Sequence, residues 1–389
     1  MLLLHVSDTH LGADKPRRHG RVRERELDFY DVFDEVIDIA IKEGVDAVIH
    51  CGDFFNKAEP SPQTYYYAFK SLRRLRDSGI PFLVIAGQHD QPKTATLSPL
   101  KLFDEVGLAR TLAIANASTS VIKLRSGELG VTAIPYTHPQ LINDVVKMLR
   151  KPESGKRILM AHLLLKELGI PNAHISLSEL GVMDYAYVAL GDYHLRYEVN
   201  YGGTPVVYPG STEALDVLEA SDERYVVLVD LSGSEARVNW IKLNSFRRWV
   251  VLNDVRSYSQ LIKSLDNIWY SMPGKPPMLH IRVSKDLPSG DSKLINDYLD
   301  SLVRSNKILF YRIEVPGVIE EESSGTYEEV SYVPTLELVV HNVVGDKDLA
   351  EVLLGIIKGC DDVGFVNLMI NRLVSDVSLL SRLERLIKK

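Results

Sequence analysis

Carboxylate, imidazole and amide side chains follow five apolar stretches of the chain, each directly past the C-terminal end of its stretch. These side chains belong to Asp8 and His10, to Asp53, to Gln88 and His89, to His162, and to Asp192 and His194. Ligand-binding residues collect at that edge of open α/β sheets. Carboxylate oxygen suits hard divalent cations, and imidazole suits transition metals. The residue types and their order therefore predict a site for two divalent ions.

Asp53 is the residue around which this prediction is arranged. It follows the apolar run that starts at Ala47 and stops at Gly52, as expected where a buried strand ends in a loop. One carboxylate can give an oxygen to each of two ions, which lie roughly 3.5–4 Å apart in such sites. Asp8 and His10 are two residues apart, as are Asp192 and His194, so an extended chain would direct each pair to one side.

In this order, Asp-x-His, Gly-Asp, Gly-Gln-His-Asp, a lone His and Gly-Asp-x-His resemble the signature of the calcineurin-like metallophosphoesterases. Further stretches are similar to the branch that repairs DNA double-strand breaks, the SbcD-type nucleases and their archaeal counterparts. These stretches are Val6–Gly12, Arg25–Asp28, Gly52–Phe55, Pro60–Pro62 and Tyr208–Ser211. The resemblance covers about residues 1–215 by motif, and the rest of the chain by layout.

Three positions depart from the family pattern. Gln88 stands where the family has Asn, and Asp192 stands where it has the first His of Gly-His-x-His. Asn56 stands where related nucleases often carry a His. Gln88 and Asp192 would both belong to the second metal, so they affect its affinity and identity.

The resemblance implies a two-metal DNA nuclease that uses manganese, with magnesium as an alternative. Asp8, His10, Asp53 and His194 would hold the first ion. Asp53, Gln88, His162 and Asp192 would hold the second. His89 would protonate the leaving sugar oxygen or stabilise the charge that develops there. The implied activities are a 3′-to-5′ exonuclease on duplex ends and an endonuclease on single strands, with an SMC-like coiled-coil ABC ATPase of the SbcC type as partner.

Two other functions stay open. One is a phosphatase that acts on proteins or small molecules with the same metals. The other is a scaffold for DNA ends, in which a weakened second metal site leaves little nuclease activity. A basic loop that follows His10 favours DNA over small substrates, because it can contact phosphates; its alternative role is a solvated loop. Its candidate DNA-binding residues are Lys15, Arg17, Arg18, Arg21 and Arg23, and Arg25 ends the loop.

The bulk properties predict a cytoplasmic protein that does not enter membranes. A chain of 389 residues should hold two or three domains. Its net charge of −7 excludes a protein that is basic overall, so any contact with DNA must use local basic patches. No apolar run reaches the roughly 18 residues of a membrane span. Met1–Val6 runs directly into the first motif, which leaves no room for a signal peptide.

Periodicity predicts alternating strands and helices, which the resemblance makes a four-layer α-β-β-α sandwich over residues 1–243. Alternation alone also allows one doubly wound sheet. Strands at 225–231 and 236–243 are expected to close the second sheet. Periodicity also predicts a small α+β unit at 244–315, ordered β-α-β-α-β, which the resemblance implies is a domain that caps the DNA. An acidic linker at 316–334 and C-terminal helices at 335–389 complete the prediction. The last helix would either bind the ATPase partner or pack on its own chain.

The helix at 61–78 is the predicted contact of a homodimer. It carries three consecutive tyrosines, Tyr65–Tyr67, which must spread around the helix so that some face outward. We expect Tyr66 and Phe69 near the two-fold axis; scattered surface tyrosines are the alternative. His5, His50 and His280 are expected to be structural, and Cys51 is expected to be a small buried apolar residue. His138, His174 and His341 are not expected to bind metal, because no candidate ligands neighbour them in the sequence.

Overall fold

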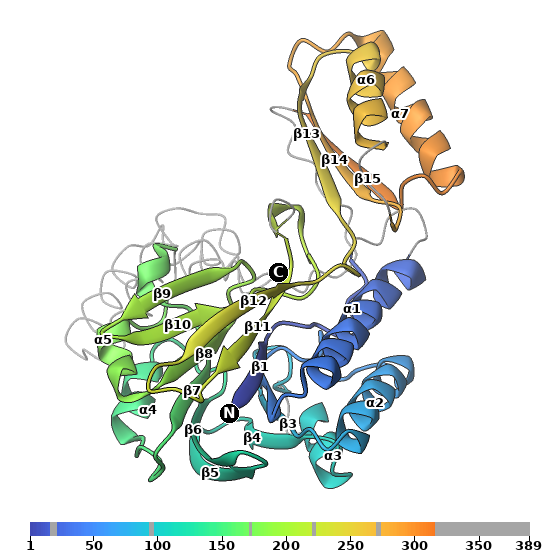
Figure 1. Ribbon diagram of the computed structural model, residues 1–389. Helices are drawn as coiled ribbons and strands as arrows, with labels where there is room; N and C mark the ends of the chain where they lie inside the picture. The colour runs from blue at the N-terminus through green and yellow to red at the C-terminus, as the bar shows by residue number, and fades with distance from the viewer. Residues whose placement is uncertain (16–21, 93–96, 171–172, 220–222, 270–273, 316–389) are drawn as a thin grey trace, which may run out of the picture. The chain divides into compact units, whose positions relative to one another are not determined.

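The computed structural model describes residues 1–15, 22–92, 97–170, 173–219, 223–269 and 274–315 (Figure 1). The predicted acidic linker and C-terminal helices therefore lie outside the described residues, as do Arg17, Arg18 and Arg21. Within the described ranges, no helix is long and apolar enough to cross a membrane.

The first sheet is mixed, with six strands in the order β12-β11-β1-β2-β3-β4. The strands are β1 (Leu2–Val6), β2 (Ala47–Cys51), β3 (Phe82–Ile85), β4 (Arg110–Ala113), β11 (Tyr225–Asp230) and β12 (Arg237–Lys242). β11 runs antiparallel to β1, with Leu2 opposite Asp230. The prediction that 225–231 and 236–243 close the second sheet is therefore wrong. They close the first, because β11 pairs with the backbone edge of β1 that β2 leaves free.

The second sheet is also mixed, with six strands in the order β5-β6-β7-β8-β10-β9. The strands are β5 (Ser118–Leu124), β6 (Gly127–Ile134), β7 (Arg157–His162), β8 (Tyr187–Gly191), β9 (Tyr197–Tyr201) and β10 (Thr204–Tyr208). The four inner strands run parallel, and β5 and β9 are antiparallel edges. The parallel strands are apolar on both faces, as expected for strands covered on both sides.

The two sheets pack face to face, and helices cover their outer faces (Figure 1). Leu3 and Ile49 of the first sheet share a core with Val131 and Met160 of the second. The first sheet's outer face is covered by α1 (Val22–Glu43), α2 (Pro62–Asp77) and α3 (Pro99–Glu105), and the second sheet's by α4 (Ile142–Met148) and α5 (Leu177–Leu180). This is the layered α/β architecture expected from the sequence.

Residues 249–314 form a smaller sheet with a core of its own. Its strands are parallel, in the order β13-β14-β15, and helices connect them. The elements are β13 (Trp249–Val255), α6 (Tyr258–Trp269), β14 (Met278–Val283), α7 (Ser289–Arg304) and β15 (Phe310–Glu314). Leu261, Ile281 and Leu299 are buried together between helices and sheet. The order β-α-β-α-β agrees with the sequence, and the role as a DNA cap stays a prediction.

A buried ionic network joins the start of α1 to the segments around it. Arg25 lies in α1 and is fully buried, so it does not belong to the polar loop in which the sequence placed it. Its Nη1 lies 3.1 Å from Glu213 Oε1 and 3.3 Å from Asp28 Oδ2. Arg247 Nη2 donates to Asp28 Oδ1 at 2.8 Å. Burial alone would raise the pKa of Asp28, but Arg247 and its neighbouring cations outweigh it and hold that pKa below its ordinary value.

Candidate metal centre

Four of the predicted site residues have left-handed backbone conformations. The φ angles are 52° at Asp8, 43° at His10, 53° at Asp53 and 89° at Asp192. Such conformations are unfavourable for residues with a Cβ and are concentrated at functional sites. The expectation that Asp8–His10 and Asp192–His194 lie in extended chain is therefore wrong. The strands end before them, and the turned backbone directs the side chains.

The loops that carry these residues are bonded to one another. Asp8 N donates to Gly52 O at 3.0 Å, and His10 N donates to Asp53 O at 3.0 Å. His89 N donates to Asp53 Oδ1 at 2.8 Å, and Asp192 N donates to both Asp8 carboxylate oxygens at 3.2 Å. The loops after β1, β2, β3 and β8 therefore meet at one edge of the two sheets.

Glycine is required where these loops approach most closely. A Cβ on Gly87 would lie 2.1 Å from Asp53 Oδ1, and a Cβ on Gly191 would lie 2.1 Å from Cys51 O. A Cβ on Gly52, whose φ is +94°, would lie 2.3 Å from His162 Nδ1. The glycines that precede Asp53, Gln88 and Asp192 thus allow the neighbouring loops to approach this closely.

The side chains form three overlapping groups of possible metal ligands. They are Asp8 with His10 and His194, Asp8 with Asp53 and His162, and His10 with Asp53 and His89, each with ligand atoms within 4.8 Å of one another. Asp53 Oδ2 lies 3.7 Å from His10 Nε2 and 3.5 Å from His162 Nε2. Asp53 therefore lies between imidazoles on two sides, as a bridging carboxylate must.

The donor set fits divalent cations. His162 Nδ1 donates to Cys51 O at 2.8 Å, so in the neutral ring the lone pair lies on Nε2. That Nε2 is buried without a hydrogen-bond partner among the described residues. His10 Nε2 and His194 Nε2 lie only 3.3 Å apart, close enough to share one ion. A buried polar atom without a partner is costly, and a bound cation would remove that cost.

Burial and charge shift the pKa values of this centre in both directions. Burial raises the pKa of Asp8 to about 6, against the opposing charges of His162 and His194. Burial alone would lower the pKa of His194, but the Glu219 carboxylate outweighs it and raises that pKa to about 9. Burial alone would raise the pKa of Asp53, but His162 outweighs it and that pKa is lowered.

Comparison with known proteins identifies the family of this centre. The family model of the calcineurin-like phosphoesterases matches residues 1–208. Proteins named DNA double-strand break repair protein Mre11 from Sulfurisphaera tokodaii and Sulfolobus acidocaldarius are 30% and 31% identical to the chain. The matches cover 87% and 89% of this chain, and 87% and 91% of those proteins. The Mre11 protein of Saccharolobus solfataricus is 28% identical, over 95% of this chain and 98% of its own. The chain belongs to the Mre11 family of calcineurin-like phosphoesterases.

Gln88 and Asp192, the two departures from the family pattern that were assigned to the second metal, lie at the solvent side of the centre. The side chain of Gln88 is exposed, and within the described residues it makes no hydrogen bond to the other site residues. The side chain of Asp192 is 20% exposed, and its Oδ1 lies 3.9 Å from His162 Nε2. The carboxylate of Asp192 thus lies near the ring of His162, and both Gln88 and Asp192 stay predicted ligands.

His89 lies beside the ligands with one ring nitrogen already bonded. Its Nδ1 donates to Asn56 O at 2.9 Å, and its ring packs edge-on against His10 with centroids 4.9 Å apart. Asn56 thus takes part through its backbone, whichever side chain stands there.

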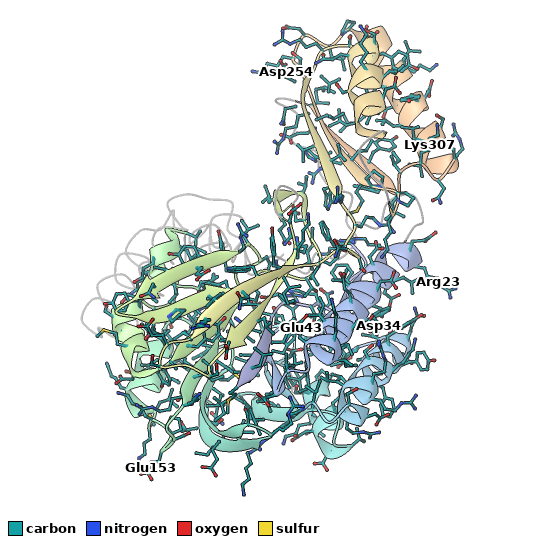
Figure 2. All side chains as sticks on the ribbon, in the orientation of Figure 1. Arg23, Asp34, Glu43, Glu153, Asp254 and Lys307 are labelled. Atoms are coloured by element: carbon teal, nitrogen blue, oxygen red, sulfur yellow. The ribbon has the colours of Figure 1, made fainter. Side chains whose placement is uncertain are left out.

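Few residues of the predicted DNA-binding loop lie in the described ranges. Lys15 is exposed, and its carbonyl oxygen accepts from Arg25 Nε at 2.9 Å. Arg23 is exposed at the start of α1 and extends away from it (Figure 2). Both side chains belong to the part of the chain that follows the predicted ligand His10.

Sequence reasoning missed buried residues that hold the predicted ligands or the loops that carry them. Asp90, known only as the last letter of a motif, is buried and accepts from the backbone N of Phe54, Phe55 and Gly87. Burial raises its pKa to about 7. Glu219 and Arg224 contact His194, and no local pattern marks them.

Three expectations are confirmed: Cys51 is buried, and His5 and His50 are buried and bonded to Tyr187 and Thr9.

Proposed function

We propose that this protein is a manganese-dependent DNA nuclease that processes the ends of double-strand breaks. The observation that carries the proposal is the convergence of carboxylates and imidazoles around Asp53, on loops that hydrogen-bond to one another. The names of the relatives, which refer to DNA double-strand break repair, supply the substrate class.

Two ions would be held by overlapping sets of side chains that share Asp53. The first set is Asp8, His10, Asp53 and His194, and the second is Asp53, Gln88, His162 and Asp192. Mixed oxygen and imidazole ligands favour manganese, with magnesium as the alternative. When bound, such ions neutralise the charge of a phosphodiester and lower the pKa of the attacking water.

His89 is the proposed general acid. Because its Nδ1–H donates a hydrogen bond to Asn56 O, Nε2 is the atom that can exchange a proton with the substrate. In the protonated ring, Nε2–H would donate to the leaving sugar oxygen. Its half-buried position beside His10 gives it access both to the ligands and to a bound substrate.

The proposed DNA contacts come from the segment that leaves His10. Lys15 and Arg23 present exposed cations there, and Arg17, Arg18 and Arg21 lie between them in the sequence. Such residues would bind phosphates and fix the duplex end without reading its sequence. We further propose that residues 244–315 cap the DNA and that residues 335–389 bind an SMC-like ATPase of the SbcC type.

A DNA-end scaffold with little nuclease activity is the second candidate. The exposed side chain of Gln88 favours the scaffold, because a predicted ligand that stays in solvent would lower the affinity for the second ion. The nuclease should cleave DNA when metal is present, whereas the scaffold should bind DNA ends without metal-dependent cleavage. A cleavage assay therefore distinguishes the two functions.

The deciding experiment is cleavage of end-labelled duplex and single-stranded DNA with manganese, magnesium or neither. We expect 3′-to-5′ digestion of duplex ends and internal cuts in single strands, with manganese the stronger activator. Asp53→Ala should abolish both cleavage and metal binding, since one carboxylate serves both ions. Asp144→Ala, which removes an exposed carboxylate on α4, is the matched control and should change neither.

Other outcomes would select another function. DNA-end binding without metal-dependent cleavage would favour the scaffold. Phosphate release from phosphopeptides or small phosphate esters, with intact DNA, would favour a metallophosphatase.

A further inference from the structure

The ring of His194 is bonded on the side away from the metal centre. Its Nδ1 lies 2.8 Å from Glu219 Oε1, and the carboxylate must be the acceptor of that bond. The opposite nitrogen, Nε2, lies 3.9 Å from Asp8 Oδ1 and 3.3 Å from His10 Nε2. In the neutral ring, which is the form that binds a metal, Glu219 thus selects the tautomer whose lone pair on Nε2 faces the other predicted ligands.

Glu219 is itself held on every polar side. Its Oε2 accepts from Ser211 Oγ at 2.9 Å and from Leu215 N at 3.2 Å, and its side chain is 10% exposed. Both Ser211 and Leu215 belong to the segment that follows β10. The carboxylate therefore cannot rotate away from His194 without losing several hydrogen bonds.

Arg224 joins Glu219 to the backbone of the ligand. Its Nη1 donates to His194 O and to Ser211 Oγ, both at 3.0 Å, and lies 3.5 Å from Glu219 Oε2. Its Nη2 donates to Glu219 O. Arg224 is one of the largest fully buried side chains. Arg224 therefore ties the Glu219 carboxylate to the backbone of His194 and places a positive charge beside that carboxylate.

We propose that Glu219, held by Arg224 and Ser211, is a positioning residue that sets the ring of His194 for metal binding. The inference rests on the proposed metal centre. A carboxylate behind a ligating histidine fixes the ring and makes its free nitrogen a stronger donor. Removing Glu219 should therefore lower the affinity for the ion that His194 binds and leave the affinity for the other ion largely unchanged.

The test is calorimetric titration of the full chain with manganese. Glu219→Ala should lower the affinity of one of two sites by about 10- to 100-fold, the usual effect of such partners. Glu219→Gln should lower it less, because an amide oxygen still accepts from Nδ1–H but carries no charge. Glu223→Gln is the matched control: Glu223 is four residues along, exposed, and paired with Lys242. We expect it to bind both ions as the wild type does.

A second readout separates positioning from a purely structural role. The imidazole nitrogen resonances of His194 report its tautomer directly, and the thermal midpoint reports stability. The proposal requires that Glu219→Gln alter metal affinity or tautomer at temperatures where the variant is fully folded. If Glu219→Ala does not fold, Glu219→Gln alone decides.

Two results would overturn the inference in distinguishable ways. If wild type binds two ions and folded Glu219 variants bind them equally well, His194 needs no positioning partner and the proposed metal centre stands. If wild type binds no manganese, the metal centre itself is wrong, and this inference with it.

Discussion

His89 and its neighbours give the most direct test of roles at the scale of single residues. His89→Ala should slow cleavage by about 10²-fold or more, as expected for loss of a general acid, and should bind two manganese ions normally. Single-turnover cleavage and calorimetry measure the two effects separately. His138→Ala, at an exposed histidine, should leave both unchanged. Weaker manganese binding by His89→Ala would make His89 a ligand instead, which its nearness to His10 and Asp53 would permit.

Asp192 carries a prediction about the second ion. Its Oδ1 lies 3.9 Å from His162 Nε2, and its backbone N is bonded to Asp8. Asp192→Ala should weaken one manganese site by roughly 10-fold or more, at least the effect seen when residues outside the ligand shell are changed. A calorimetric titration that still shows two sites of full affinity would remove Asp192 from the centre and favour the scaffold function.

The clustering of the candidate ligands around Asp53 could be predicted from sequence because each lies at or directly past the C-terminal end of a strand, and strands are marked by local apolar runs. The left-handed φ angles of Asp8 and Asp53 could not be predicted, since they depend on loops from distant strands. Glu219 was missed for the same reason. It reaches His194 from a segment whose only local mark is Tyr208–Ser211.

At the scale of the strands and helices, the ends of β8 and β2 approach each other closely at the metal centre. Gly191 ends β8, and a Cβ there would lie 2.1 Å from the carbonyl oxygen of Cys51 at the end of β2. Gly191→Ala should therefore separate the two sheets at the metal centre, lowering both thermal stability and manganese affinity. Gly155→Ala is the control, because a Cβ at that exposed glycine meets nothing within 4 Å. Equal melting temperatures for the two variants would show that the sheets adjust without loss.

Local patterns predicted most strands and helices, but not which strands pair. β11 and β12 were recognised as strands and assigned to the wrong sheet, because pairing with β1 joins residues more than two hundred positions apart. The short α3 and β4 carry too few residues to show a period and were missed. Arg25 was placed in a loop because a charged residue is expected at the surface. Its buried partners, Asp28 and Glu213, could not be inferred from the sequence.

Association is the question at the scale of the whole molecule. On α2, Tyr66 is 65% exposed and Phe69 is 43% exposed. On and after α3, Leu102 and Val106 are also exposed, and stacking of Tyr65 on Phe103 joins the two helices. We therefore propose a two-fold dimer through α2, with α3 at its side. The double variant Tyr66→Asp, Phe69→Asp should sediment as a monomer.

A matched substitution elsewhere tests whether that effect is specific. Met148 at the end of α4 is 83% exposed, and Met148→Asp should leave the dimer intact. A dimer that survives the double variant would place the contact on another surface.

The strained loops of the metal centre have a consequence for the protein when metal is scarce. Left-handed conformations at Asp8, His10, Asp53 and Asp192 store energy that only their hydrogen bonds and a bound ion offset. An ion at 100 times its dissociation constant stabilises the folded loops by about 2.7 kcal/mol. Without it, these loops should be the first part of the sandwich to open locally. Hydrogen exchange at the amides of Asp8 and His10 would then measure the free manganese concentration.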